Sequence, residues 1–170
     1  MPTALQMAAN DAALQAAVAR GRKLLNKRAL VAAAASAVPV PGLDWAVDAA
    51  MLSKLIPEIN REFGLSPQQL DQLTPKKREQ VQKAVTLVGS VLIGKLISRE
   101  LVMKAASKIG MRLTTKQLAK YVPFAGQIVS AAVGYAAIRY LGEEHMKDCV
   151  RVATQAELDV PQLAYSAVKT

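Results

Sequence analysis

The only histidine and the only cysteine of the chain, His145 and Cys149, lie four residues apart. On a helix this spacing places both side chains on one face, with Glu144 and Asp148 beside them. A zinc ion needs three or four ligands, and the sequence offers no second cluster of ligands. A nucleophilic cysteine needs a base and a group that orients the base, and His145 is the only candidate base. We interpret these residues as a polar helix turn and expect no metal, no cofactor and no catalytic residue.

One segment approaches the spacing of a phosphate-binding loop. Gly89, Gly94 and Lys95 supply the pattern G-x-x-x-x-G-K. The complete motif ends in Ser or Thr, whose hydroxyl binds Mg²⁺, and it connects a strand to a helix. Leu96 takes the place of that hydroxyl, and the residues before the motif predict a helix. We therefore interpret the segment as a helix-packing patch and expect no nucleotide there.

Two carboxylates, Asp44 and Asp48, stand inside a largely apolar segment. Near the start of a helix, carboxylates accept hydrogen bonds from free backbone N–H groups and suit the helix dipole. A buried carboxylate is costly unless it is paired, so a role toward a membrane interior or a partner is the alternative.

The composition predicts the elements that must position these residues. Hydrophobic residues make up 52% of the 170 residues and aromatic residues only 4%, and a single cysteine excludes a disulfide framework. Abundant Ala, Leu, Lys and Gln favour helix, and no alternating strand pattern is found. We predict an all-α fold, one domain over residues 1–170 with about seven or eight helices. An N-terminal helix in residues 1–27, a core in residues 28–155 and a short C-terminal helix in residues 156–170 make up that domain.

Capping residues and glycines predict the helix boundaries. Gly64 fits the left-handed position that ends a helix, and Ser66-Pro67 and Thr74-Pro75 each combine an N-cap residue with Pro at the first helical position. Helices are expected over residues 3–25, 27–37, 44–63, 74–109 and 127–156. Short helices are expected after Ser66, after Thr114 or Thr115, and after Asp159.

Two Pro-containing breaks share the pattern V-P-x-x-G, at residues 38–42 and 122–126. Each follows a short helix and precedes an Ala-rich helix, which predicts two apolar helix–Pro-loop–helix units related by a pseudo-twofold axis; chance similarity is the alternative. Small residues spaced by four on one helix let another backbone approach closely. The residues expected to serve packing or insertion of these units are Pro39, Pro41, Gly42, Asp44, Asp48, Pro123, Gly126, Ser130 and Gly134.

Charge is distributed unevenly along the chain, which has 22 Lys and Arg, 13 Asp and Glu, and a net charge of +9. Eleven basic residues face two acidic ones in residues 76–120, and residues 20–28 add five basic residues without an acid. A basic amphipathic helix is typical of a surface that binds anionic membranes or acidic partners; a solvated helix face is the alternative. The residues expected to bind are Lys95, Arg99, Lys104, Lys108, Arg112, Lys116 and Lys120.

Other partners and segments are not expected. Nucleic-acid binding would need aromatic residues among the basic ones, and none interleaves with them. No small-molecule substrate is evident. No signal peptide is found, and the longest uncharged stretches, residues 29–43 and 121–138, are shorter than the about 20 apolar residues that span a bilayer. They predict either buried bundle helices or interfacial hairpins with Lys120 and Arg139 at head-group level.

Residues 34–65 and 122–152 resemble the helical C-terminal domain of immunity-related (interferon-inducible) GTPases. The first segment carries V-P-V-P-G at residues 38–42, then Ala46-Val47-Asp48, and ends at Phe63-Gly64-Leu65. Both segments are also similar to an uncharacterised helical domain of bacterial inner-membrane proteins associated with small GTPases. The resemblance covers about residues 28–155. No phosphate-binding loop accompanies it, so we expect no GTPase activity.

The resemblance and the charge distribution imply a non-catalytic, membrane-associated helical module. It would act with a protein partner in trans, for instance a GTPase, on the cytoplasmic side of a membrane as a peripheral or integral protein. A membrane-inserting or pore-forming effector is one alternative. A soluble helical scaffold, a homo-oligomer joined through small-residue faces, is the other.

Overall fold

The computed structural model describes residues 2–35, 43–90, 92–93 and 126–161. These residues form helices and no strand, so the predicted all-α fold is confirmed for the described part of the chain. The helices there are fewer than the seven or eight expected for all 170 residues. They are α1 (Ala4–Met7), α2 (Ala12–Ala35), α3 (Leu43–Glu62), α4 (Pro67–Asp71), α5 (Pro75–Val88) and α7 (Gly126–Gln155).

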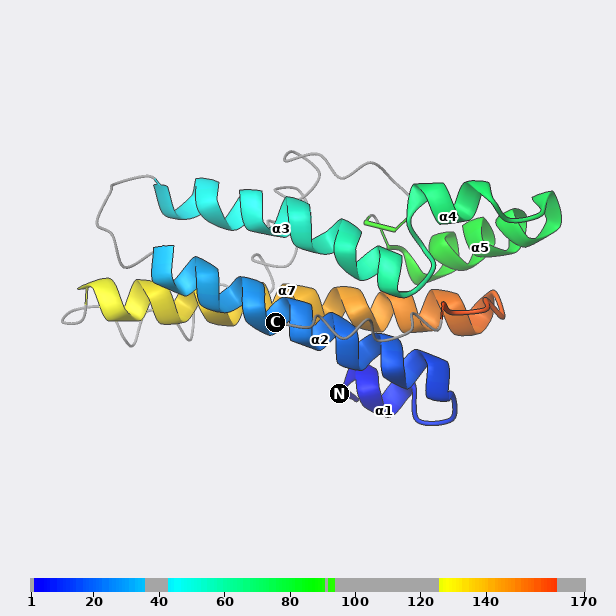
Figure 1. The fold of residues 1–170 in the computed structure, drawn as a ribbon, viewed down its shortest axis with the longest axis horizontal. Helices are drawn as coiled ribbons and strands as arrows, with labels where there is room; N and C mark the ends of the chain where they lie inside the picture. Colours follow the sequence, from blue (N-terminus) through cyan, green and yellow to red (C-terminus); the bar gives the residue numbers. More distant parts are fainter. Residues whose placement is uncertain (1, 36–42, 91, 94–125, 162–170) are drawn as a thin grey trace, which may run out of the picture.

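Helices α2, α3 and α7 lie lengthwise and form the body of the molecule (Figure 1). Helix α2 packs against both α3 and α7, α5 packs on α7, and the short α1 packs beside α7 and α2. The end of α2 and the starts of α3 and α7 lie together at one end of the molecule, at the left in Figure 1. Helices α4 and α5 and the last turns of α7 lie at the opposite end.

The hydrophobic core lies where α2, α3 and α7 meet. Each fully buried Leu, Ile, Val or Phe side chain there contributes about 1.5–3 kcal/mol by removal from water. The largest fully buried side chains in this core include Val18, Leu25, Leu55, Ile59, Phe63, Met146 and Val150.

Several predicted helix ends are confirmed. Gly64 has φ +73°, and the N–H of Leu65 donates to the carbonyl of Asn60 at 2.8 Å, which is the hydrogen bond of a Schellman cap. Ser66 and Thr74 are the N-caps of α4 and α5, each followed by Pro, as the sequence predicts. The last long helix, predicted over residues 127–156, is α7.

The boundary predicted near residue 26 is wrong. Instead of helices over residues 3–25 and 27–37, α1 ends at Met7 and α2 continues unbroken from Ala12 to Ala35. Asp11 starts α2, because its carboxylate accepts the N–H of Leu14 at 2.9 Å. Asn26 does not end the helix, because its side chain accepts a hydrogen bond from Arg139 at 2.7 Å and does not compete for the backbone.

The helix predicted from Thr74 to residue 109 is also wrong, because α5 ends at Val88. Gly89 has φ +71° and closes the helix with its N–H bonded to the carbonyl of Val85 at 3.0 Å. The N–H of Ser90 bonds the same carbonyl at 3.3 Å. Gly89 is therefore a helix cap, and the prediction that it lies inside a long helix is wrong.

Candidate functional site

The predicted membrane-binding residues, at positions 95–120, lie outside the described residues. Pro39, Pro41, Gly42 and Pro123 lie outside them too. Asp44 and Asp48 lie in the first turns of α3, and Gly126, Ser130 and Gly134 lie on one stripe of α7. For these five residues the structure describes the helical backbone and not the side chains.

His145 and Cys149 belong to a buried polar cluster that also contains Asn60. Asn60 Nδ2 donates to the carbonyl of Leu92 at 2.9 Å, so Asn60 Oδ1 faces His145 Nε2, which lies 2.8 Å away. Cys149 Sγ lies 3.7 Å from the same Oδ1 and 3.6 Å from Nε2. Because Oδ1 accepts only, Nε2 carries the ring proton and Nδ1 of His145 is left with a lone pair. The cluster joins α3, α7 and the chain after α5.

Burial sets the charge state of the two titratable groups in this cluster. One route to a nucleophilic cysteine is an ion pair of a thiolate with an imidazolium. Burial lowers the pKa of His145 to about 4, and burial raises the pKa of Cys149 well above its usual value, so both groups are held neutral. In the described ranges no three His, Cys, Asp or Glu residues gather in a group able to hold a metal ion. The described contacts therefore make His145 and Cys149 part of the α3–α7 packing.

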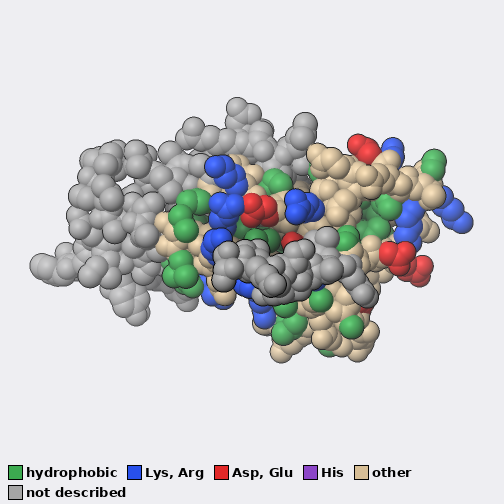
Figure 2. Space-filling model, viewed as in Figure 1, with side chains coloured by type: hydrophobic (Ala, Val, Ile, Leu, Met, Phe, Trp, Pro, Cys, Tyr) green, Lys and Arg blue, Asp and Glu red, His purple; other side chains and the backbone are tan. Residues whose placement is uncertain are grey.

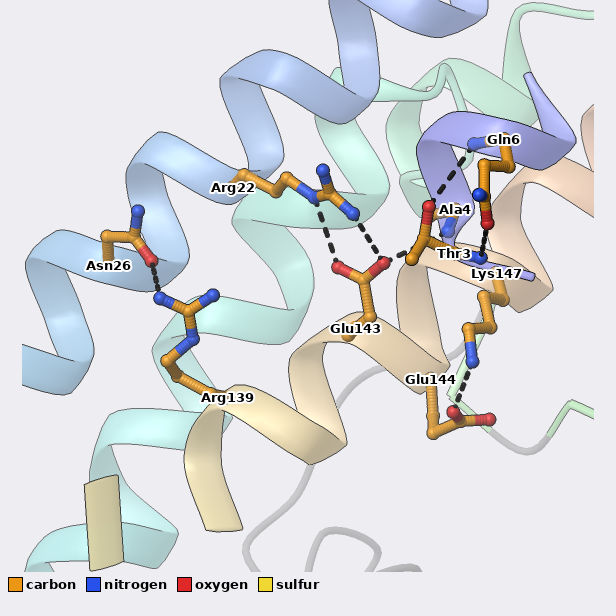
Figure 3. A network of polar contacts seen from close by, with 9 residues as sticks. All are labelled: Thr3, Ala4, Gln6, Arg22, Asn26, Arg139, Glu143, Glu144 and Lys147. Carbon is orange, nitrogen blue, oxygen red and sulfur yellow. Dashed lines mark hydrogen bonds and ion pairs between the residues drawn. The ribbon is translucent and has the colours of Figure 1, made fainter. Parts of the chain in front are cut away.

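A second polar network fastens α1 and α2 to α7 around Glu143 (Figure 3). Arg22 donates to both carboxylate oxygens, from Nη2 at 2.7 Å and from Nε at 3.2 Å. The backbone N–H of Ala4, in the first turn of α1, donates to Glu143 Oε1 at 3.0 Å. Burial alone would raise the pKa of Glu143, but the hydrogen bonds from Arg22 and Ala4 outweigh it and lower that pKa. Glu143 therefore binds a backbone N–H at the start of α1, whose N-cap is Thr3, and also pairs with Arg22.

A groove of about 390 Å³ lies between α2 and the last turns of α3. Three basic and two acidic side chains line it with two apolar ones. Figure 2 shows Lys and Arg side chains gathered over α2 and α3 near the middle of this face. The lining residues are Leu24, Lys27, Arg28, Val31, Glu58, Arg61 and Glu62.

The sequence predicts a basic cluster in residues 20–28, but it does not show which of these basic residues form ion pairs in the structure. Arg20 pairs with Glu62, Arg28 Nη2 lies 2.6 Å from Glu58 Oε1, and Arg22 is committed to Glu143. Lys27 has no acidic partner within the described residues. The groove could have been anticipated only from the register of α2 against α3, which the spacing of charges along the chain does not contain.

Charge also separates along the length of the bundle. Residues 29–35 of α2 and 126–138 of α7 contain no charged residue, and both lie toward the end where α3 begins. Leu30 and Val31 are 62% and 48% exposed there. None of the helices described is long and apolar enough to cross a membrane.

Comparison with models of known protein families finds none that matches this chain, and comparison with solved structures finds no match either.

Proposed function

We propose that this protein is a non-catalytic helical module that binds anionic membrane surfaces through the end of the bundle where α3 and α7 begin. We further propose that it binds as a peripheral protein on the cytoplasmic side and acts there with a protein partner. The observation that carries the proposal is the charge separation along the bundle. In the described helix segments at that end, residues 29–35, 43–53 and 126–138, the only charged residues are Asp44 and Asp48.

The length of the uncharged segments suits shallow insertion. Residues 126–138 extend about 20 Å along α7 at about 1.5 Å per residue, which is shorter than a hydrocarbon core of about 30 Å. A helix end of this size reaches the boundary between head groups and acyl chains without spanning the bilayer.

The residues that border the uncharged segments, on the side away from the end of the bundle, suit a head-group layer. Lys27, Lys54 and Arg139 are exposed, and Tyr140 is half-exposed beside Arg139. Lys and Arg near an anionic leaflet contribute about 1 kcal/mol each, and Tyr favours the interface between acyl chains and water. Apolar helix ends followed by basic and aromatic residues are the order that an interfacial protein presents to a membrane.

Vesicle flotation of the full chain tests the proposal, with Leu30→Asp as the variant. Leu87→Asp is the matched control, because Leu87 is 79% exposed on α5, at the opposite end of the molecule. We expect the parent and Leu87→Asp to float with vesicles of phosphatidylcholine and phosphatidylglycerol. Leu30→Asp should bind about tenfold or more weakly, because it places a carboxylate in the inserted end. Equal flotation of both variants contradicts the proposed orientation.

Two further readouts in the same preparation separate the alternatives. Release of an entrapped dye at low protein concentration would replace the proposal with the membrane-inserting effector. A stable dimer that does not float with any vesicle would replace it with the soluble scaffold.

The partner part of the proposal rests on the resemblance to GTPase-associated helical domains. A GTPase supplied in trans is the partner that this resemblance favours. Phosphate release from GTP by the purified chain would contradict the non-catalytic part of the proposal.

A further inference from the structure

The groove between α2 and α3 is lined by more basic than acidic side chains. Its acidic residues are already paired: Glu58 with Arg28, at 2.6 Å, and Glu62 with Arg20. Lys27 and Arg61 also line the groove, are exposed, and have no ion pair with any acidic residue that the structure describes. The groove therefore presents two positive charges that the surrounding carboxylates do not neutralise.

The two cations differ in kind, and the difference indicates a phosphate. A guanidinium offers a planar pair of donors that matches two oxygens of a phosphate, and an ammonium adds a point charge. They approach the groove from different helices, Lys27 from α2 and Arg61 from α3. A single phosphate group between the helices could be contacted from both sides.

Apolar side chains line the same groove beside the cations. Leu24 and Val31 stand within one turn of Lys27 on α2, and all three line the groove. Val31 is half-exposed, and the uncharged end of α2 begins two residues before it, at Ala29. A ligand with both an anionic and an apolar part would fill this surface, whereas a free inorganic anion would leave the apolar part uncovered.

We propose that this groove binds the head-group phosphate of an anionic phospholipid. Lys27 and Arg61 contact the phosphate oxygens, and Leu24 and Val31 lie against the glycerol and the first acyl carbons. The volume of about 390 Å³ is at the small end of the range for ligand pockets and suits a head group without its acyl tails. This inference rests on the proposed function, because it names the lipid chemistry that the membrane-binding end would meet.

The test compares two double variants. The groove variant carries Lys27→Gln and Arg61→Gln in one protein, and the control variant carries two substitutions at the other end of the molecule. The control variant, Lys76→Gln with Lys77→Gln, removes the same number of positive charges from α5, at the opposite end of the molecule. Both residues of the groove pair are exposed, so the variant should unfold at the same temperature as the parent by circular dichroism. A variant that does not fold is replaced by Arg61→Lys alone, which keeps the charge but removes the paired donors.

The first measurement uses a short-chain phosphatidylglycerol, below its micelle concentration, titrated into each protein by calorimetry. We expect the groove variant to bind on the order of thirty-fold more weakly than the parent, and the α5 variant to bind as the parent does. Arg61→Lys should lie between them. Equal binding by the parent and the groove variant overturns the inference.

Two competitors identify the source of the phosphate. Inorganic phosphate should displace the lipid only at far higher concentration, since it lacks the apolar part. Equal affinity for inorganic phosphate would overturn the lipid assignment. Preferential displacement by poly-glutamate would overturn it in favour of an acidic protein partner.

Vesicle flotation separates this inference from the proposed function. If the groove variant floats as the parent does while Leu30→Asp fails, the groove inference is wrong and the membrane proposal stands. If the short-chain lipid binds in the groove and the parent does not float with vesicles, the membrane proposal is wrong and the groove binds a soluble phosphate ester.

Discussion

His145 couples the stability of the bundle to pH. Its ring is buried and donates from Nε2 to Asn60, and burial lowers its pKa to about 4, against 6.5 for an ordinary histidine. The unfolded chain therefore binds a proton more readily than the folded chain does. Stability contributed by neutral His145 is complete above about pH 6.5 and is lost as the pH falls toward 4.

We expect acidification from pH 7 to pH 4 to cost the parent up to about 3 kcal/mol through His145, since one pKa unit corresponds to about 1.4 kcal/mol. Urea unfolding at both pH values measures this, with His145→Gln as the comparison, because Gln keeps a donor for Asn60 but does not titrate. The stability of the variant should fall less between the two pH values. The same pH dependence in parent and variant would exclude His145 as the source.

Glu157 is a residue whose backbone conformation conflicts with its type. It follows the end of α7 with φ +46°, and the N–H of Leu158 bonds the carbonyl of Ala153 at 2.9 Å. This is the cap position that glycine occupies at Gly64 and Gly89, and a side chain there costs about 1–2 kcal/mol.

Glu157→Gly should therefore stabilise the protein by about 0.5–1 kcal/mol, the remainder being lost to the greater entropy of glycine in the unfolded chain. Denaturant unfolding of the parent and the variant measures this difference in the free energy of unfolding. Glu157→Ala is the control, since it removes the same side-chain charge and keeps the Cβ atom. Equal stability of the Gly and Ala variants would mean that the backbone conformation carries no cost.

At the scale of the elements, the contact between α2 and α7 depends on two glycines. A Cβ atom at Gly142 would lie 2.5 Å from Leu25 Cδ1, and one at Gly21 would lie 2.8 Å from Met146 Sδ. Both distances are shorter than the about 3.5 Å of van der Waals contact. Both side chains are fully buried, but Leu25 is branched, whereas Met146 is unbranched and repacks more easily.

Gly142→Ala should destabilise the protein by up to about 2 kcal/mol, because an overpacking cost of about 1–3 kcal/mol exceeds the gain of about 1 kcal/mol in helix propensity. Gly21→Ala should have a smaller effect on stability, close to zero, because the cost of repacking Met146 is small and is balanced by the same gain in helix propensity. Thermal and denaturant unfolding of the two variants check the order. The reverse order would show that Leu25 moves more easily than Met146.

The sequence predicts those helix ends whose caps have a local cause. Ser66-Pro67, Thr74-Pro75 and Gly64 carry their own hydrogen-bonding and backbone preferences, and all three were predicted. The role of Gly89 was predicted wrongly, because a glycine either ends a helix or sits at a helix contact. Only packing decides between the two, and it makes Gly89 a cap and Gly21 a contact with α7.

The groove could not be predicted, for a similar reason. Lys27 and Arg61 are distant in sequence, and each is one basic residue among many. The hairpin of α2 and α3 brings them to one surface, and the ion pairs of Arg20 and Arg28 then leave them as the unpaired charges among the described residues of the groove. The spacing of His145 and Cys149 predicts that they share a helix face, but not that both are buried, and their partner Asn60 comes from α3 and had no local signal.

At the scale of the whole molecule, the only tryptophan reports on the proposed orientation. Trp45 lies in the first turn of α3, at the end proposed to meet the membrane. On binding to anionic vesicles, its emission should shift to shorter wavelength and become less accessible to acrylamide, because the indole ring favours the membrane interface.

The matched control moves the reporter to the other end. In a Trp45→Phe background, Leu87→Trp places the only tryptophan on α5, where position 87 is exposed. This variant should still float with vesicles and show no shift. A shift from position 87 as large as that from Trp45 would contradict the end-on orientation.

The bond between Glu143 and the N–H of Ala4 has a consequence for synthesis on the ribosome. Helix α1 has four residues, too few to persist alone, and the carboxylate that binds the N–H of Ala4 is made 139 residues later. At about 5–20 residues per second, residues 4–7 wait roughly 7–28 seconds for their partner. Among the described helices, the first to leave the ribosome is therefore among the last to reach its final place.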